Sequence, residues 1–321
     1  MSNNRIILSP TGSYKVGVCK YNLYNEFRKT FEYPEGQLIP IQIYFPLSKG
    51  PHTPKEKIYE EFAPKLFPIL KNKVFAEQAN VKSISSGKHP VVIFNHGNGA
   101  IMTDYAILNE ELASHGFIVI CIQHQLVTDK TQPEIWNNRS CAKHSNIIDN
   151  ILYVFDWIKK NKNEFSGNID TSKVALIGHS MGGNALFMLA NRITSIFRSG
   201  VNSLLPHEPT HSNVKECIVF IDGELQFPYP TKYPILFCLS EERQIYQKNT
   251  GIMELLKQSG YKFHYYPGSR HISFMDHAYL NESLPHNSNE KYFNGTISDC
   301  KAFYKNLRKD ILNFLNENIR Y

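Results

Sequence analysis

Long apolar runs are missing from this chain of 321 residues. No stretch approaches the roughly 18–20 consecutive apolar residues that a membrane-spanning helix requires. The N-terminus also lacks a charged segment followed by an apolar one, which is the pattern of a secretory signal peptide. These absences predict a protein that is not transmembrane, and that is either cytoplasmic or exported without a Sec signal.

Strong charge and paired cysteines are also absent. The 35 Lys and Arg residues exceed the 29 Asp and Glu residues by only six, and no long basic block or nucleic-acid motif occurs. We therefore expect no nucleic-acid partner. The six cysteines show no CxxC or other paired spacing, and His207 and His211 are four apart in a loop-like segment rich in Pro and Thr. The sequence thus predicts neither a disulfide framework nor a metal or cofactor site.

Short β-rich runs alternate with longer helical segments, with no repeat or linker between them. This alternation predicts one α/β domain over residues 1–321, with a mostly parallel sheet covered by helices on both faces. The expected strands are 14–23 and 38–45, an antiparallel edge, followed by 91–94, 117–122, 174–177, 217–221, 235–239 and 263–266. The expected helices are 104–114, 147–158, one that follows residue 180, 253–258 and 299–319.

Two segments do not fit this alternation. Residues 51–87 predict a helical insertion near the active-site entrance, in which Pro64 and Pro68 interrupt an apolar stripe at helical spacing. This stripe, within residues 58–75, could contact a membrane interface or pack against the core, and both readings stay open. Residues 281–297 are polar and rich in Asn, which is typical of a surface loop.

The segment VALIGHSMGGNA (174–185) carries the clearest chemical motif. Gly178-His179-Ser180-Met181-Gly182 fits G-x-S-x-G between an expected strand and an expected helix, the context of a nucleophile elbow. The glycines allow a strained turn to lie close to its neighbours. The alternatives are a phosphate loop or a plain turn, but the spacing of a phosphate loop is absent. Ser180 is therefore the candidate nucleophile.

A serine hydroxyl needs a base, and in this motif class the order along the chain is Ser, acid, His. His271 follows the last expected strand through a Pro-Gly-Ser-Arg turn, so it is the candidate base. His277 is a close rival, and His264 lies inside a strand pattern. The remaining histidines after Ser180 lie in polar loops: His207, His211 and His286.

The third member is an acid that orients the base. Asp222 ends the expected strand 217–221, which favours it moderately. Glu241 and Glu242 follow the next strand, the more usual position for the acid, and they stay open as rivals.

An oxyanion hole needs two backbone N–H groups, one after the nucleophile and one from the loop after an earlier strand. Met181 is the candidate for the first. Asn98 is the candidate for the second, because it lies between Gly97 and Gly99 directly after an apolar strand. Its side chain need not take part.

With these residues in place, the chain resembles the plasma and intracellular type II platelet-activating factor acetylhydrolases, which are lipoprotein-associated phospholipase A2-like α/β-hydrolases. The similarity begins near TGSYKVG (11–17) and extends to the C-terminal helix. It is most specific in FNHGNGAIMTDYAILNEELASHGFIVICIQHQ (94–125). The other matching pieces are GHSMGG, Ile221-Asp222…Phe227-Pro228 and Gly268-Ser269-Arg270-His271.

The resemblance implies an α/β-hydrolase fold, a calcium-independent phospholipase A2 activity on short or oxidised sn-2 acyl chains, and Asp222 as the acid. It also implies that residues 51–75 correspond to the apolar surface with which this family contacts lipid. Two departures concern the substrate pocket: Met181 where the family often has Phe, and a polar run at 223–226. The composition, rich in Asn and Lys, and the missing signal peptide favour a microbial relative.

The leading hypothesis is thus a serine hydrolase whose partner is a phospholipid or another acyl ester. One alternative is a general short-chain carboxylesterase or cutinase-like polyesterase, since such enzymes also contain GHSMGG. Another, of a different class, is an inactive scaffold that binds a membrane or a partner.

Overall fold

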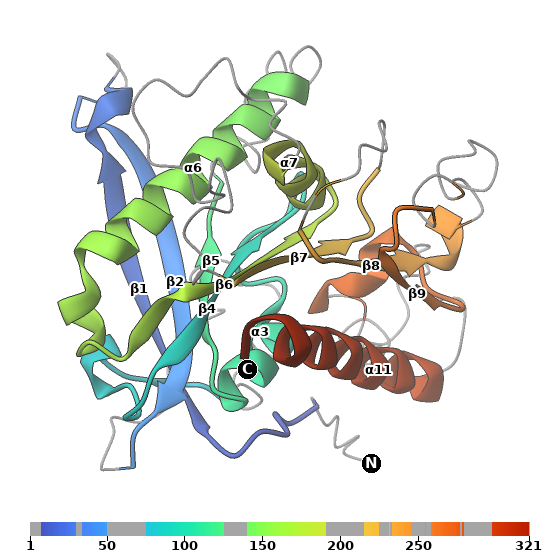
Figure 1. Ribbon diagram of the computed structural model, residues 1–321, viewed down its shortest axis with the longest axis horizontal. Helices are drawn as coiled ribbons and strands as arrows, with labels where there is room; N and C mark the ends of the chain where they lie inside the picture. Colours follow the sequence, from blue (N-terminus) through green and yellow to red (C-terminus); the bar gives the residue numbers. More distant parts are fainter. Residues whose placement is uncertain are drawn as a thin grey trace, which may run out of the picture.

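The computed structural model describes residues 8–29, 34–49, 75–124, 140–190, 215–224, 231, 233–244, 254, 258–276, 278 and 297–320. Within these residues nine strands form one sheet in the order β3-β1-β2-β5-β4-β6-β7-β8-β9 (Figure 1). The strands are β1 (Lys15–Asn25), β2 (Gln37–Leu47), β3 (Glu77–Gln78), β4 (His89–Asn95), β5 (Ile118–Ile122), β6 (Ile169–His179), β7 (Lys215–Ile221), β8 (Ile235–Ser240) and β9 (Lys262–Tyr266).

The direction of the strands places the carboxyl ends of the central ones at one edge. β1 pairs antiparallel with β2, and β2 pairs antiparallel with β5. From β5 to β9 each neighbouring pair is parallel. β6 lies between β4 and β7, so the loops that leave these three strands meet at the same edge of the sheet.

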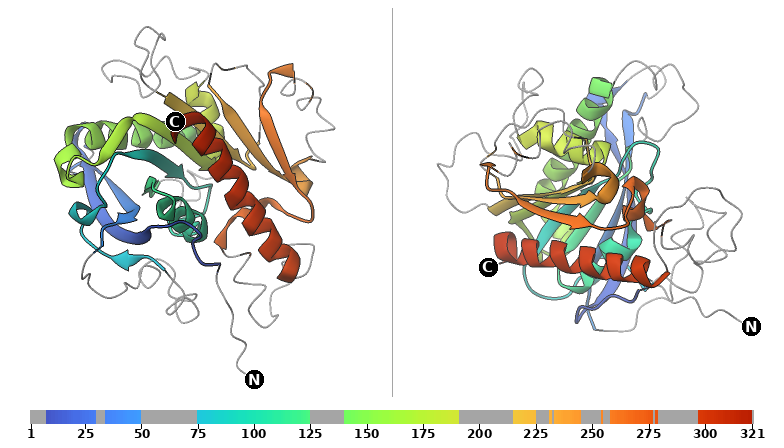
Figure 2. Two further views of the ribbon diagram at one scale, coloured as in Figure 1. Left: turned by 60° about the horizontal axis from the view of Figure 1, so that its bottom comes forward. Right: turned by 90° about the vertical axis from the view of Figure 1, so that its right-hand side faces the viewer.

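Helices cover both faces of the sheet. α6 (Ser140–Lys160) and α7 (Met181–Ala190) lie on one face, whereas α3 (Ala106–Ser114) and α11 (Ile297–Leu315) lie on the other (Figures 1 and 2). Short helical turns complete the described elements: η1 (Glu26–Arg28), η2 (Val81–Ser83), η3 (Lys162–Phe165), η5 (His271–Phe274) and the π-helical η6 (Asn316–Arg320).

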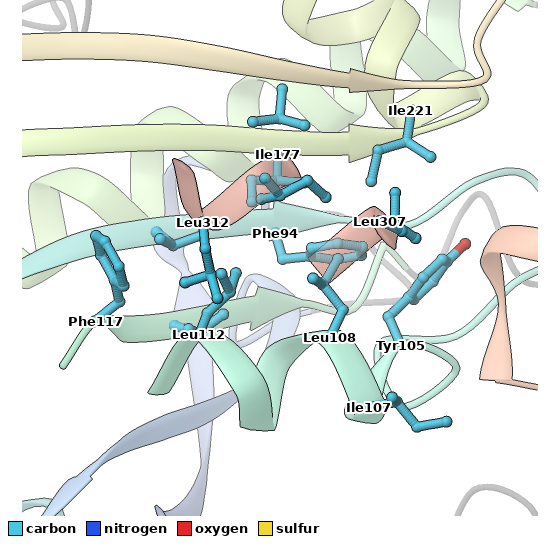
Figure 3. Close-up of a cluster of buried hydrophobic side chains, with 14 of the residues drawn as sticks. Phe94, Tyr105, Ile107, Leu108, Leu112, Phe117, Ile177, Ile221, Leu307 and Leu312 are labelled. Carbon is cyan, nitrogen blue, oxygen red and sulfur yellow. The ribbon is translucent and has the colours of Figure 1, made fainter. Parts of the chain in front are cut away.

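The side chains of each central strand alternate between these two faces. Val92 and Phe94 of β4 pack toward α3 and α11, whereas Val91 and Ile93 pack toward α6 and α7. All seven residues of β4 are buried, which explains why the strand reads as a continuous apolar run. Figure 3 shows the cluster on the α3 and α11 face. Burying one such Leu, Ile or Phe side chain stabilises the fold by about 1.5–3 kcal/mol.

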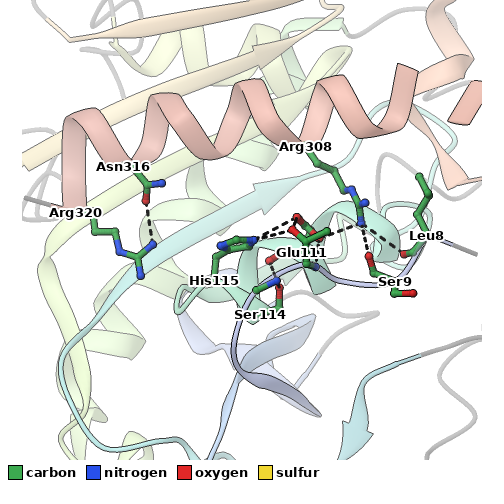
Figure 4. A network of polar contacts seen from close by, with 10 residues as sticks. Leu8, Ser9, Glu111, Ser114, His115, Arg308, Asn316 and Arg320 are labelled. Atoms are coloured by element: carbon green, nitrogen blue, oxygen red, sulfur yellow. Dashed lines mark hydrogen bonds and ion pairs between the residues drawn. The ribbon is translucent and has the colours of Figure 1, made fainter. Parts of the chain in front are cut away.

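A buried ion pair connects the last long helix with α3 (Figure 4). Arg308 of α11 lies 3.0 Å from Glu111 of α3, and both side chains are almost fully buried. The same guanidinium donates a hydrogen bond to the backbone oxygen of Ser9, and Glu111 accepts one from the backbone N–H of Thr11. The first described segment is thus attached to α3 and α11.

The sheet predicted from the sequence is confirmed, including the antiparallel edge and every strand expected after it. β3 and the short turns were not predicted. Of the insertion expected at 51–87, the described part contains β3 and η2, whereas residues 50–74 lie outside the described residues. The loop expected at 281–297 is outside them up to residue 296, as is most of the helix expected at 253–258.

Candidate active site

Ser180 lies at the sharp turn between β6 and α7. Its φ is 53°, a left-handed conformation that residues other than glycine rarely adopt. The two glycines of the motif are required by close backbone approach. A Cβ at Gly178 would lie 2.5 Å from the carbonyl carbon of Gly182, and a Cβ at Gly182 would lie 2.4 Å from the oxygen of Asn95. The turn is therefore held tightly against the end of β4.

The structure brings Ser180, His271 and Asp222 together. His271 Nε2 lies 2.9 Å from Ser180 Oγ, and its Nδ1 lies 2.8 Å from Asp222 Oδ2. Since the carboxylate accepts, His271 Nδ1–H donates to Asp222, and Nε2 is left to accept the hydroxyl proton of Ser180. These are the contacts and the tautomer that a general base requires.

Asp222 is held in place by the strand that neighbours its own. It directly follows β7, has a φ of 46° and is fully buried. The backbone N–H of Ser240, at the end of β8, donates to its Oδ1 at 2.6 Å. Burial raises the pKa of Asp222, but the hydrogen bonds and charge of His271 and the Ser240 hydrogen bonds outweigh it and lower the pKa below its ordinary value. The carboxyl group is thus ionised at neutral pH.

The rival acids lie next to the base without touching its ring. Glu242 accepts a hydrogen bond from the backbone N–H of His271 at 3.3 Å, and Glu241 accepts one from Gly268 at 3.1 Å. Both are exposed and support the loop that carries His271.

Of the rival bases, His264 lies on β9, where its Nδ1 is 3.2 Å from Asp310. The four others lie outside the described residues: His207, His211, His277 and His286.

The turn after β4 lies beside the serine. A Cβ at Gly97 would lie 2.9 Å from Ser180 Cβ. His96 Nδ1–H donates to the oxygen of Gly97 at 2.8 Å, while His96 Nε2 accepts from the backbone N–H of His124. In a planar trans peptide the C=O and the next N–H point in opposite directions. The Asn98 N–H therefore points away from His96.

The oxyanion hole was expected to include Met181 and Asn98, which lie on different elements of the structure. Met181 is the first residue of α7, so its N–H has no acceptor within the helix. The Asn98 side chain instead lies near α6, with its Oδ1 3.5 Å from Lys143 Nζ.

Sequence reasoning missed the buried polar residues around the triad. His179 Nδ1 lies 2.9 Å from the hydroxyl of Tyr105, and its Nε2 lies 3.0 Å from the backbone oxygen of His271. Burial, together with the nearby charge of His271, lowers the pKa of His179 to about 3. Burial also lowers the pKa of His96 to about 4. The position of His179 beside the nucleophile was the available indication.

The polar run noted after Asp222 begins with a glycine that the packing requires. A Cβ at Gly223 would lie 2.4 Å from the ring of Phe220 and 2.5 Å from Asn184 Oδ1. Residues 225 and 226 lie outside the described residues.

Known proteins resemble this chain in sequence. The family model described as platelet-activating factor acetylhydrolase, isoform II, matches residues 2–132, and the chlorophyllase model matches residues 79–215. The dog platelet-activating factor acetylhydrolase is 28% identical over 202 residues, which are 49% of this chain and 45% of that protein. The bovine protein is 26% identical over 188 residues, which are 45% of this chain and 42% of that protein.

The chain is thus similar to the platelet-activating factor acetylhydrolases over part of its length. The aligned part spans less than half the length of the dog and bovine acetylhydrolases. A second similarity is to cutinase 1 of Thermobifida cellulosilytica, which is 33% identical over 108 residues, or 34% of this chain and 35% of that protein.

A solved structure shows the fold. The ferulic acid esterase from Streptomyces cinnamoneus aligns with a TM-score of 0.73 at 16% identity, over 98% of this chain and 93% of that chain. The expected α/β-hydrolase fold is thus confirmed.

The described residues also bear on metal binding and on membrane crossing. In the part of the chain that the structure describes, no three His, Cys, Asp or Glu side chains are grouped to hold a metal ion. Among the same residues, no helix combines the length and apolar character needed to cross a bilayer.

Proposed function

We propose that the chain is a serine-dependent acyl-ester hydrolase in which Ser180, His271 and Asp222 form the catalytic triad. The observation that carries this proposal is the continuous line of contacts from Ser180 Oγ through both nitrogens of His271 to Asp222. A structural serine would not need a buried carboxylate held at hydrogen-bond distance behind the histidine.

The first half of the reaction forms an acyl-enzyme. His271 Nε2 takes the proton of Ser180 Oγ while the oxygen attacks the ester carbonyl carbon, and the carbonyl oxygen becomes an oxyanion. Ionised Asp222 stabilises the imidazolium. The backbone N–H groups of Met181 and Asn98 stabilise the oxyanion, where loss of one donor typically lowers turnover by about 10²–10³. The intermediate then breaks its ester C–O bond, and His271 protonates the leaving alcohol.

The second half restores the enzyme. A water molecule gives a proton to His271 and attacks the acyl carbon of the Ser180 ester. The second oxyanion collapses, the bond to Ser180 Oγ breaks, and that oxygen recovers its proton from His271. The products are one alcohol and one carboxylic acid, and no metal or cofactor is needed for any step.

The substrate that we favour is a phospholipid with a short or oxidised sn-2 acyl chain, hydrolysed without calcium. The similarity to several curated platelet-activating factor acetylhydrolases supports this choice. The second candidate is a general short-chain ester or a polyester, which the similarity to the cutinases and to the chlorophyllase family supports.

Two experiments test the proposal. A fluorophosphonate probe should label the wild-type protein and not Ser180→Ala, and persistent labelling of the variant would remove Ser180 from the mechanism. Absence of labelling in the wild type would instead favour the inactive scaffold that binds a partner. Phosphatidylcholines with sn-2 chains of increasing length, assayed beside p-nitrophenyl esters, then separate the two substrate classes. Equal rates with and without the glycerophospholipid part would contradict the phospholipase assignment.

Contact with a membrane surface through residues 58–75 is a separate proposal, and these residues lie outside the described part of the chain. An apolar stripe flanked by lysines is typical of an interfacial helix. Co-sedimentation with liposomes should be weaker for Phe62→Asp than for the wild type, and equal binding would favour packing against the core. The proposed compartment is the cytoplasm or the exterior, and no nucleic-acid partner is proposed.

A further inference from the structure

A buried pair of side chains beside Ser180 connects the turn before α3 with the loop that carries His271. The pair consists of Tyr105, in the turn before α3, and His179, the residue before Ser180. Both are almost fully buried. The hydroxyl of Tyr105 lies 2.9 Å from His179 Nδ1, and His179 Nε2 lies 3.0 Å from the backbone oxygen of His271.

The direction of each hydrogen bond follows from the groups involved. A carbonyl oxygen only accepts, so His179 Nε2–H donates to His271. Because burial and the charge of His271 keep the pKa of His179 at about 3, the ring is neutral at neutral pH and its Nδ1 accepts the hydroxyl proton of Tyr105. The two rings of His179 and His271 also stack, with centroids 4.8 Å apart and planes 29° apart.

The turn that precedes Asn98 lies against this pair, because a Cβ at Gly97 would be 3.3 Å from His179 Nδ1. The Tyr105 ring packs against Phe94 with centroids 4.6 Å apart. Figure 3 shows the ring at the end of the apolar cluster, with its hydroxyl pointing away from the aliphatic side chains.

We propose that Tyr105 and His179 form a tether, by which we mean these two side chains, the hydrogen bond between them and the hydrogen bond from His179 to the His271 backbone. The tether sets the position of the catalytic base, and of the turn at residues 97–98, relative to Ser180. This inference rests on the proposed hydrolase function. Neither residue touches the reacting atoms, so both act as positioning residues. Their role is to hold the His271 backbone from the inside of the protein, where Glu242 holds it only from the exposed side.

The neutrality of the His179 ring is part of this role. In the transition state His271 becomes a cation. Because the stacked ring of His179 is neutral, it places no second positive charge beside this cation. A misplacement of about 1 Å at a catalytic group lowers the rate by about 10²-fold. Loss of the tether should therefore affect the chemical step and leave substrate binding nearly unchanged.

The test compares Tyr105→Phe with Tyr44→Phe. Tyr44 is a matched control, because its ring is fully buried and its hydroxyl has a buried partner in Gln42, but it pairs with Val119 far from the carboxyl ends of the strands. Both variants lose one buried hydroxyl. Tyr105→Phe should lower kcat for a soluble ester by about 10- to 100-fold with KM within about two-fold. Tyr44→Phe should leave both constants unchanged.

His179 provides a second, independent readout. His179→Phe keeps a ring and removes both hydrogen bonds, whereas His179→Gln keeps a donor that reaches the His271 oxygen. His179→Phe should lower kcat as Tyr105→Phe does, and His179→Gln should have a kcat substantially closer to that of the wild type. The Tyr105→Phe/His179→Phe double variant should be no slower than the slower of the two single variants. Equal kcat for wild type and both single variants, or losses that multiply in the double variant, would overturn the tether.

The same experiments separate this inference from the proposed function. Failure of the wild type to react with a fluorophosphonate at Ser180 would refute the hydrolase proposal itself. Normal labelling of wild type, Tyr105→Phe and His179→Phe at one rate would refute the tether alone. If Tyr105→Phe unfolds, the comparison of His179→Gln with His179→Phe decides the question.

Discussion

Two neighbouring glutamates of α3 should change the stability of the protein with pH in opposite directions. Glu110 is almost fully buried and accepts a hydrogen bond from the backbone N–H of Ala76 at 3.1 Å. Burial raises its pKa from 4.5 to about 7, although backbone hydrogen bonds and the charge of Arg308 act against the rise. Tyr44 and Asp276 are the other titratable groups close to it.

The size of this pH effect on stability follows from the pKa of Glu110, which is 4.5 in the unfolded chain and about 7 in the folded protein. Below pH 4.5 the group is protonated in both the folded and the unfolded protein, and its contribution to stability is fully present. As the pH rises toward 7 the unfolded chain loses this proton first, so the contribution is lost. The loss amounts to about 3 kcal/mol, because one pKa unit corresponds to about 1.4 kcal/mol.

Glu111 provides the matched opposite case. Burial raises its pKa, but hydrogen bonds from His115 and Thr11 and the charge of Arg308 outweigh burial, and the pKa is lowered overall. The ionised carboxylate thus stabilises the fold above the unfolded value of 4.5, and this contribution is lost as the pH falls through the folded pKa.

The assay is urea unfolding of wild type, Glu110→Gln and Glu111→Gln between pH 3 and 7.5 at constant ionic strength. Relative to wild type, Glu110→Gln should gain about 3 kcal/mol in the free energy of unfolding as the pH rises across this range. Glu111→Gln should be destabilised to nearly the same extent from pH 7.5 down to 4.5, and its deficit should shrink only below pH 4.5. A Glu110→Gln difference that stays flat, or that changes in the same direction as that of Glu111→Gln, would refute the reasoning.

Two further predictions concern the triad. Asp222→Asn should keep the geometry of the site, since Asn tolerates the φ of 46°. It should lower kcat by about 10⁴, because the amide no longer selects the Nδ1–H tautomer of His271. A normal kcat in steady-state kinetics would exclude Asp222 as the orienting acid. Ser180→Gly should be about 1 kcal/mol more stable than Ser180→Ala. Both variants lack the hydroxyl, and only glycine adopts a φ of 53° without strain. Equal unfolding midpoints of the two variants would mean that the turn stores no strain.

The sheet could be predicted from the sequence because its central strands are buried on both faces. Strands such as β4 and β8 are continuous apolar runs with a turn after them, and the longer helical segments between successive strands indicate parallel pairing. β3 has two residues and no pattern of its own, since it depends only on its pairing with Gly17 and Val18 of β1. Pairing between distant segments is a tertiary property that local pattern does not contain.

The candidate active site was likewise predictable only where the sequence has a local pattern. Ser180 has a local motif, and the chain order after it leads to His271. The choice between Asp222 and Glu242 cannot be made locally, because both follow strands of the same sheet. It depends on the folded position of His271, whose Nδ1 lies 2.8 Å from Asp222, whereas Glu242 accepts only from the His271 backbone. Tyr105 is farther still from prediction, since 74 residues separate it from His179.

The contact between Arg308 and Glu111 has a consequence for folding during synthesis. β1 to β9 and α3 are all made before α11, so during that time Glu111 lacks its Arg308 partner and the apolar sheet face that α11 covers is open. A nascent chain is therefore prone to aggregate until α11 leaves the ribosome. We expect chains truncated before residue 297 to sediment with aggregates or remain bound to chaperones, whereas the full chain stays in solution. The last helix thus completes the folding of the first segment, to which Arg308 is hydrogen-bonded at Ser9.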